Sequence, residues 1–314
     1  MKTAIKLEGV SKHFGKRTVV DNLSLETHAG EVFGFLGPNG AGKTTTIKMI
    51  VGMINIDEGN ISICGADVRK EFEKAMCRVG AIVENPEMYK YMTGLQNLQQ
   101  YARMRKGVTR ERIQEVVEMV GLSNRIQEKV SKYSLGMRQR LGVAQALLHH
   151  PKVLILDEPT NGLDPAGIRQ LRDILKNLAH KENICVLVSS HLMSEMQLMC
   201  DRVGIIDQGK LIQVTTVEEL VYQTGKEGST YRYHVDDAVG AGAVIQKHEQ
   251  CGVTVLDEEH LEVEVEGDER NHVLAEVNRR LIDRGICLFT AAPVETQRLE
   301  DAFIELTKGD VQIV

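Results

Sequence analysis

Gly37-Pro38-Asn39-Gly40-Ala41-Gly42-Lys43-Thr44-Thr45 is the stretch around which the chain is organised. An apolar, strand-like run, Val32–Leu36, precedes it, and residues 46–51 follow with apolar side chains at helical spacing. A glycine-rich loop between a strand and a helix, with the pattern G-x-x-x-x-G-K-[ST], is the setting of a phosphate-binding loop. Its glycines let backbone N–H groups turn toward phosphate oxygens, and the helix adds the positive end of its dipole.

Two side chains of this loop are expected to carry its chemistry. Lys43 should reach the β- and γ-phosphates of a nucleotide, and the hydroxyl of Thr44 should bind Mg²⁺. The alternative is a glycine-rich turn that contains a Lys-Thr pair by chance.

A pair of acids follows the four consecutive aliphatic residues Val153–Leu156. Such a run predicts a central strand that is buried on both faces. Asp157 and Glu158 stand at its end, where ligands bind in open α/β sheets. We expect Asp157 to hold Mg²⁺ through water alongside Thr44, and Glu158 to take the proton of an attacking water. The alternative is a pair of exposed acids at a strand end.

Further positions have both a functional and an ordinary interpretation. Phe14, in a loop expected over residues 11–17, either stacks on adenine or packs within the turn. Ser134 and Gly136 open a helix and form either an anion site or a simple helix cap. His191, at the end of a buried strand expected over residues 184–189, either contacts a γ-phosphate or is an ordinary helix-start residue.

Composition limits the classes of protein that the chain can belong to. It has 314 residues, which favours about two domains, and 42% of them are hydrophobic, enough for a buried core. A net charge of -6 gives no indication of nucleic-acid binding. The six cysteines are scattered without a C-x-x-C pair, which is typical of reduced cysteines in a cytosolic protein. The N-terminus lacks the apolar core of a signal peptide, and no apolar run approaches the ~20 residues that span a bilayer.

The periodicity predicts two parts. Strands dominate up to about residue 83, helical periodicity then runs over about 86–150, and buried strands alternate with helices to about 220. From residue 229 the order is βαββαβ, which suggests a small ferredoxin-like module, with an amphipathic helix over residues 299–306 at its end. This second part contains no catalytic constellation, and its acidic turn is most simply a solvated face.

The order of these motifs over residues 3–220 resembles that of the ATP-binding subunit of an ABC transporter. The loop over residues 37–45 resembles Walker A, residues 153–158 resemble Walker B with its catalytic glutamate, and residues 134–139 resemble the signature motif. Residues 161–164 resemble the D-loop, His191 the switch histidine, and Phe14 the adenine-stacking aromatic.

The resemblance implies an α/β fold: a P-loop ATP-binding cassette with a mixed sheet core and a helical subdomain, over residues 1–222, followed by the small α+β module over 229–314. It implies ATP and Mg²⁺ as ligands. It also implies a homodimer or paired cassettes that close head-to-tail around two ATP molecules, with Ser134 and Gly136 of one copy on the γ-phosphate held by Lys43 of the other.

The chain departs from the family pattern at two motifs. The signature, usually L-S-G-G-Q, here includes Leu135 and Met137. The Q-loop position, usually glutamine, is Glu84, a carboxylate that can bind Mg²⁺ or orient water while adding negative charge near the triphosphate. Together with the C-terminal module, Glu84 resembles the ATPases of bacitracin- and lantibiotic-resistance exporters.

The function implied by the resemblance is ATP hydrolysis that powers a separate integral-membrane permease, for export of a peptide antibiotic or another drug. The permease should dock near residues 84–101, and the subunit should lie on the inner, cytoplasmic face of the membrane. The rivals are a soluble ABC-type ATPase and a regulatory subunit that senses nucleotide without turnover.

Overall fold

The computed structural model describes residues 2–224, 229–248, 250–265 and 270–293. The chain divides into two compact units, Met1–Val217 and Glu218–Val314. The helix α8, Val217–Thr224, begins at the boundary. The amphipathic helix expected over residues 299–306 lies outside the described residues.

The first unit is built on two sheets. The four-stranded sheet has the order β2-β1-β4-β5, and the six-stranded sheet has the order β10-β9-β3-β8-β7-β6. Within the larger sheet β9, β3, β8, β7 and β6 are parallel, and β10 pairs with β9 in the antiparallel sense. The strands are β1 Thr3–Phe14, β2 Arg17–His28, β3 Val32–Leu36, β4 Glu58–Ile63, β5 Ala66–Asp67, β6 Val79–Ile82, β7 Val153–Leu156, β8 Cys185–Ser190, β9 Arg202–Asp207 and β10 Lys210–Thr216.

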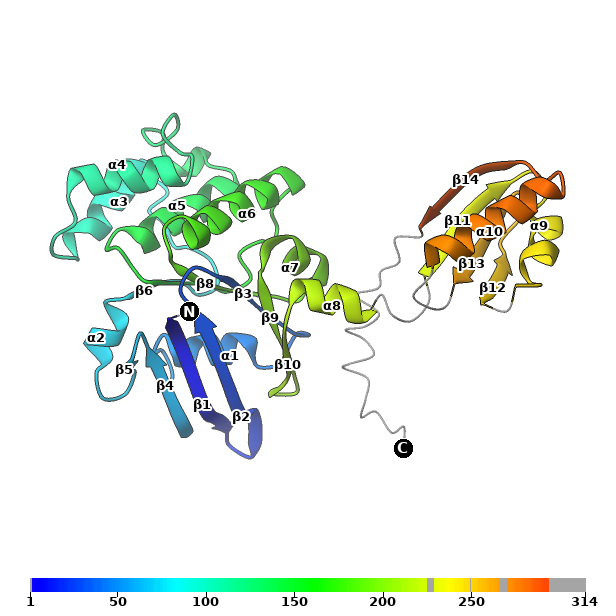
Figure 1. Cartoon of the computed structure of the whole chain (residues 1–314). Coiled ribbons are helices and arrows are strands. Elements are labelled where there is room, and N and C mark those ends of the chain that lie inside the picture. The colour runs from blue at the N-terminus through cyan, green and yellow to red at the C-terminus, as the bar shows by residue number, and fades with distance from the viewer. Residues whose placement is uncertain (1, 225–228, 249, 266–269, 294–314) are drawn as a thin grey trace. The chain divides into compact units, whose positions relative to one another are not determined.

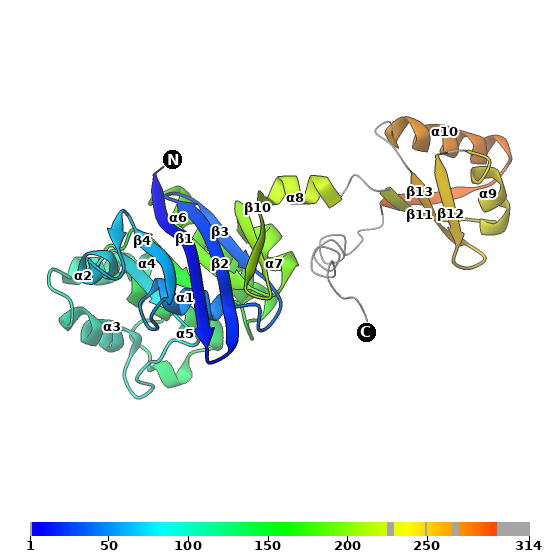
Figure 2. The ribbon, with the colours of Figure 1, turned by 90° about the horizontal axis from the view of Figure 1, so that it is seen from below.

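Helices cover the larger sheet on both sides (Figure 1). In that view α5 and α6 lie above the sheet, while α1 and the four-stranded sheet lie below it, and Figure 2 shows β1, β2 and β4 in front when the unit is seen from below. The helices of this unit are α1 Lys43–Ile50, α2 Phe72–Met76, α3 Gly94–Arg103, α4 Arg110–Met119, α5 Leu135–Leu147, α6 Pro165–His180 and α7 Met193–Met199, with a 3₁₀ turn at Val130–Lys132.

Burial explains why the central strands form where the sequence predicts them. Every residue of β3, β7 and β8 is buried. A parallel strand covered by helices on both faces has no solvent side, so its apolar residues run consecutively instead of alternating. The predicted mixed sheet with an inserted helical block is confirmed, and α3, α4 and α5 form that block.

Local signals set the helix starts. Thr93 and Gln96 form a capping box at α3, the side chain of Ser134 accepts the N–H of Met137 at α5, and Asp164 caps α6 ahead of Pro165. Each cap satisfies backbone donors that have no partner within the helix. The predicted helix start at Ser134 is confirmed.

The expected loop over residues 11–17 is wrong. Strand β1 continues to Phe14 and β2 begins at Arg17, so only two residues turn the chain. Gly15 has φ 61°, a left-handed conformation that glycine adopts without strain and that suits a tight hairpin. Phe14 therefore ends a strand instead of lying in a loop.

The second unit contains a four-stranded antiparallel sheet with the order β12-β13-β11-β14. Its elements are β11 Ser229–Val235, α9 Ala238–Ile245, β12 Cys251–Val255, β13 His260–Val265, α10 Arg270–Asp283 and β14 Leu288–Pro293. Both helices cover one face of the sheet (Figure 1). The order βαββαβ is that of the predicted ferredoxin-like module, although α9 ends four residues before the expected Glu249, since the chain turns there to begin β12.

Candidate functional site

A cavity of about 470 Å³ opens beside the phosphate loop. Its walls come from stretches far apart in the sequence: the turn between β1 and β2, the loop before α1, and the residues that follow β7 and β8. Several residues predicted for nucleotide binding or catalysis line it, namely Phe14, Asn39, Gly40, Gly42, Lys43, Thr44, Thr45, Glu158 and His191.

The backbone of the phosphate loop needs its glycines. A Cβ added at Gly37 would lie 2.3 Å from the carbonyl oxygen of Ile206. Gly42 has φ 108° and caps α1. The loop therefore passes close to β9 and turns abruptly into the helix, as only glycine permits. The loop leads directly into the N-terminus of α1 at Lys43, and the free N–H groups of a helix start favour an anion.

Lys43 lies at the centre of the site and is only 5% exposed. Its Nζ donates to the carbonyl oxygens of Gly37, at 2.7 Å, and Pro38, at 3.2 Å. The same atom lies 3.4 Å from Oε1 of Glu158. The ammonium group is thus held by its own loop and by the predicted base.

The two acids after β7 differ in their surroundings. Asp157 is 4% exposed and its Oδ1 accepts the hydroxyl of Ser189 at 2.6 Å. The side chain of Glu158 is 19% exposed, and its Oε2 lies 2.9 Å from Nδ1 of His191. Glu158 also has φ 48°, a left-handed backbone that is costly for a residue with a side chain and that clusters at functional sites.

Ser189 is a site residue that the sequence reasoning missed. It is fully buried, donates to Asp157, and accepts the N–H of Glu158 at 2.9 Å. It thereby fixes the orientation of one acid and the strained backbone of the next. The sequence did offer a signal, since two serines, Ser189 and Ser190, end a buried apolar strand, and a buried hydroxyl must find a partner. Arg17 and Asn161, which also line the cavity, were not predicted as binding residues.

Phe14 is 52% exposed and lines the cavity. The Nζ atom of Lys12 lies 5.4 Å from the centre of its ring. An exposed ring at the mouth of a phosphate site offers an apolar face on which a nucleobase can stack.

Ser134 and Gly136 do not line this cavity. Ser134 caps α5 through its Oγ, and a Cβ added at Gly136 would lie 3.8 Å from the side chain of Leu163. A single chain therefore does not bring these two residues together with Lys43.

Glu84 also lies outside the cavity lining. Its side chain is 68% exposed, its backbone has φ 67°, and its Oε1 lies 2.9 Å from Nζ of Lys48 on α1. No group of three or more His, Cys, Asp or Glu side chains in the described ranges is arranged to hold a metal ion. Of the three predicted Mg²⁺ ligands, only Thr44 lines the cavity, while Asp157 accepts the hydroxyl of Ser189 and Glu84 pairs with Lys48. One or two carboxylates with waters and substrate phosphates are the usual ligands of Mg²⁺.

Comparison with known proteins gives consistent matches. A family model described as ABC transporter matches residues 20–161. The chain is 50% identical to YhcH, an uncharacterized ABC transporter ATP-binding protein of Bacillus subtilis, with 99% of each chain covered. It is 38% identical to the bacitracin transport ATP-binding protein BcrA of Bacillus licheniformis, with 98% of this chain and 99% of BcrA covered.

The fold has solved counterparts as well. A structure of the ATP-binding subunit of an ABC transporter is similar with a TM-score of 0.62 and 26% identity, covering 71% of this chain and 93% of that chain. Among the residues described, no helix has both the length and the apolar character needed to cross a bilayer.

Proposed function

This chain belongs to the family of ABC transporter ATP-binding proteins, which are ATPases, and from that premise we propose that it powers export of a peptide antibiotic through a separate membrane permease. The observation that carries the proposal is the meeting of Lys43, Asp157, Glu158 and His191 at the carboxyl ends of β3, β7 and β8.

The proposed roles follow from the contacts. Lys43 and the N–H groups of the phosphate loop bind the β- and γ-phosphates of ATP, and Phe14 stacks on the adenine. Thr44 and Asp157 would hold Mg²⁺, and Glu84, also predicted as a ligand, would have to leave Lys48 to join them. Bound Mg²⁺ neutralises charge on the phosphates. Glu158 accepts the proton of the attacking water, and His191 orients the Glu158 carboxylate.

The contacts of Lys43 imply an order of events. Its ammonium group is now satisfied by two carbonyl oxygens and by Glu158. Phosphate oxygens carry more charge than carbonyl oxygens, so an incoming triphosphate displaces these partners. Glu158 then loses its cationic neighbour and is free to accept a proton. Nucleotide binding thus prepares the base.

The separation of Ser134 and Gly136 from Lys43 supports a dimer. Two chains related by a two-fold axis, facing head-to-tail, bring each α5 start onto the nucleotide of the other chain. ATP then stabilises the closed pair, and hydrolysis reopens it. Light scattering should show dimers of Glu158→Gln with ATP and monomers with ADP. Monomers under both conditions would contradict this arrangement.

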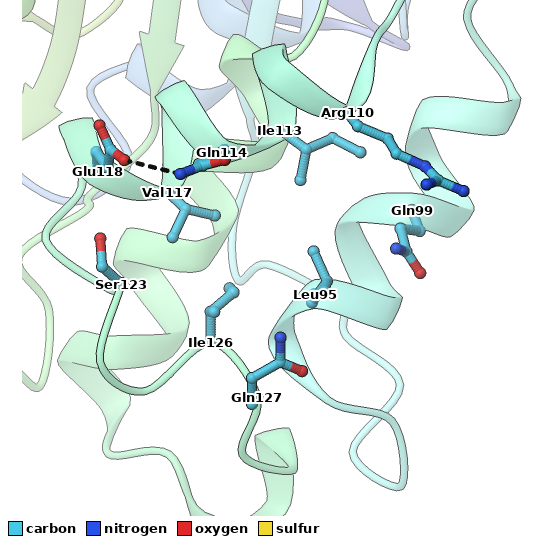
Figure 3. Close-up of a pocket in the computed structure, with 10 residues that line it drawn as sticks. All are labelled: Leu95, Gln99, Arg110, Ile113, Gln114, Val117, Glu118, Ser123, Ile126 and Gln127. Carbon is cyan, nitrogen blue, oxygen red and sulfur yellow. Dashed lines mark hydrogen bonds between the residues drawn. The ribbon is translucent and has the colours of Figure 1, made fainter.

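The proposed permease contact lies on the helical block. Tyr89, Tyr91 and Met104 are 47%, 68% and 70% exposed, and the two tyrosine rings are 5.9 Å apart. These large apolar side chains flank α3, and a groove between α3 and α4 has Leu95, Ile113 and Ile126 in its wall (Figure 3). Exposed apolar surface of this kind favours a protein partner. Docking there would hold the subunit at the inner face of the membrane.

The likeness to BcrA supports a peptide antibiotic as cargo. The test is to delete the gene and measure susceptibility to bacitracin, a lantibiotic and an unrelated dye, with complementation by the wild type and by Glu158→Gln. We expect sensitivity to a peptide antibiotic that only the wild type restores. Unchanged susceptibility to both peptides would remove the cargo assignment, while steady-state phosphate release by the purified chain tests the ATPase itself.

A further inference from the structure

Side-chain contacts continue between the segments that follow the last backbone pair of β7 and β8. The last parallel pair is Leu156 with Val188. After it, Ser189 bonds to Asp157 and to the N–H of Glu158, and His191 lies within hydrogen-bond distance of the Glu158 carboxylate. These contacts already belong to the site described above.

One more contact follows them along the chain. The hydroxyl of Thr160 donates to Oε2 of Glu195, on α7. Thr160 is 3% exposed, whereas Glu195 is half-buried. A buried hydroxyl that donates to an ionised carboxylate makes one of the stronger side-chain hydrogen bonds. Neither residue is among those that line the cavity.

Thr160 anchors the segment that contains the proposed base. Its backbone oxygen accepts the N–H of Leu163, and the backbone oxygen of Glu158 accepts the N–H of Asn161. Glu158 is strained, with φ 48°, and such a conformation persists only where neighbouring contacts over-determine it. Ser189 holds the start of this segment, and the Thr160–Glu195 bond holds its middle.

The same segment continues to the helix that carries the signature-like residues. A Cβ added at Gly162 would lie 3.0 Å from the side chain of Leu135, and one added at Gly136 would lie 3.8 Å from Leu163. Leu135, where the family pattern has glycine, thus packs over the loop that Thr160 anchors. This loop thus touches the start of α5, and the Thr160–Glu195 bond connects it to α7.

We propose that Glu195 is a positioning residue for ATP hydrolysis, which acts through Thr160 to hold the Glu158 segment in its reactive geometry. The inference rests on the proposed ATPase role of Glu158. Because the contact lies outside the cavity, its loss should slow turnover without weakening nucleotide binding.

The test compares variants that remove the bond with variants that keep it. Glu195→Ala and Thr160→Val remove it, while Glu195→Gln keeps an acceptor oxygen and Thr160→Ser keeps the hydroxyl. We expect the first pair to lower kcat by about 10-fold or more, since small misplacements of reacting groups cost up to ~10²-fold in rate. KM for ATP should stay within about twofold, and the second pair should retain most of the wild-type kcat.

The double variant of Thr160→Val with Glu195→Ala separates positioning from general damage. If the two residues act through one bond, the double variant should be no slower than the slower single variant. Glu31→Gln is the matched control, because Glu31 is also a buried acid, paired with Arg202 at 3.2 Å away from the cavity, and its loss should lower Tm but not kcat.

Each outcome has a distinct meaning. Unchanged kcat in Glu195→Ala and Thr160→Val, even with a lowered Tm, would overturn the positioning role. Multiplicative losses in the double variant, or losses in Glu195→Gln as large as in Glu195→Ala, would also overturn it. A wild-type chain that releases no phosphate from ATP would overturn the proposed function together with this inference.

Discussion

Replacing Glu158 by glutamine should tighten nucleotide binding while it slows turnover. Nζ of Lys43 lies 3.4 Å from Oε1 of Glu158, and the two side chains are 5% and 19% exposed. Two unit charges at that separation attract by about 5 kcal/mol at an effective dielectric constant of ~20. Desolvation offsets much of this attraction, so we take the net contribution as about 1–2 kcal/mol.

Glu158→Gln removes that contribution from the nucleotide-free state only. It also removes a negative charge close to the proposed position of the phosphates, which acts in the same direction. We therefore expect the Kd for ADP to fall by about 5- to 30-fold. The loss of the base should lower kcat for ATP by about 10²–10⁴-fold.

The assay is a calorimetric titration with Mg·ADP, because ADP avoids both turnover and the proposed ATP-driven dimerisation. Glu31→Gln serves as the control, since it removes one buried negative charge outside the cavity and should leave the Kd for ADP unchanged. An equal or higher Kd for ADP in Glu158→Gln would refute the competition between Glu158 and phosphate for Lys43. Undiminished hydrolysis would refute the role of Glu158 as base.

Three further predictions concern stability, pH and thiol reactivity. In the turn between β9 and β10, Gln208 has φ 46° and Gly209 has φ 83°. Asparagine followed by glycine suits such a turn best. Gln208→Asn should therefore raise the free energy of unfolding by roughly 0.5–1 kcal/mol, and with it the Tm. Gly209→Ala should lower the Tm, because the added Cβ would lie 2.5 Å from a backbone oxygen of β2. Burial lowers the pKa of His149 below the usual 6.5, so the folded chain binds fewer protons than the unfolded chain. Melting curves should therefore show stability falling as the pH drops through about 6.5, with a smaller fall in His149→Gln; an equal fall would contradict this assignment. Burial raises the pKa of Cys185 to about 12, whereas Cys77 is exposed, so mass spectrometry should find iodoacetamide on Cys77 in the native chain and on Cys185 only after unfolding.

The sequence predicted the structure best where a residue type favours one local backbone conformation. The glycines of the phosphate loop, the consecutive aliphatic residues of β7 and the cap at Ser134 each report on their own few residues. Their predicted structures are confirmed because local sterics, burial on both faces and capping leave little choice of conformation.

Contacts between segments far apart in the sequence were harder to predict. Ser189 reaches Asp157 only because β8 lies beside β7, and Thr160 reaches Glu195 across a separation of 35 residues. Such pairs depend on which strands and helices lie side by side, and the residue pattern of a single strand does not predict its neighbours. The direction of the Glu84 side chain, toward Lys48, depends likewise on how α1 lies against the end of β6.

The central claim is that the cavity around Lys43 binds the phosphates of a magnesium nucleotide, and titration of the purified chain with Mg·ATP tests it most directly. We predict saturable binding of one nucleotide per chain, weakened by about 100-fold or more in Lys43→Ala, because that change removes the buried ammonium group proposed to bind the phosphates. The control Lys6→Ala, which removes a lysine of β1 outside the cavity lining, should bind as the wild type does. Absence of binding by the wild type, or equal affinity in Lys43→Ala, would contradict the claim.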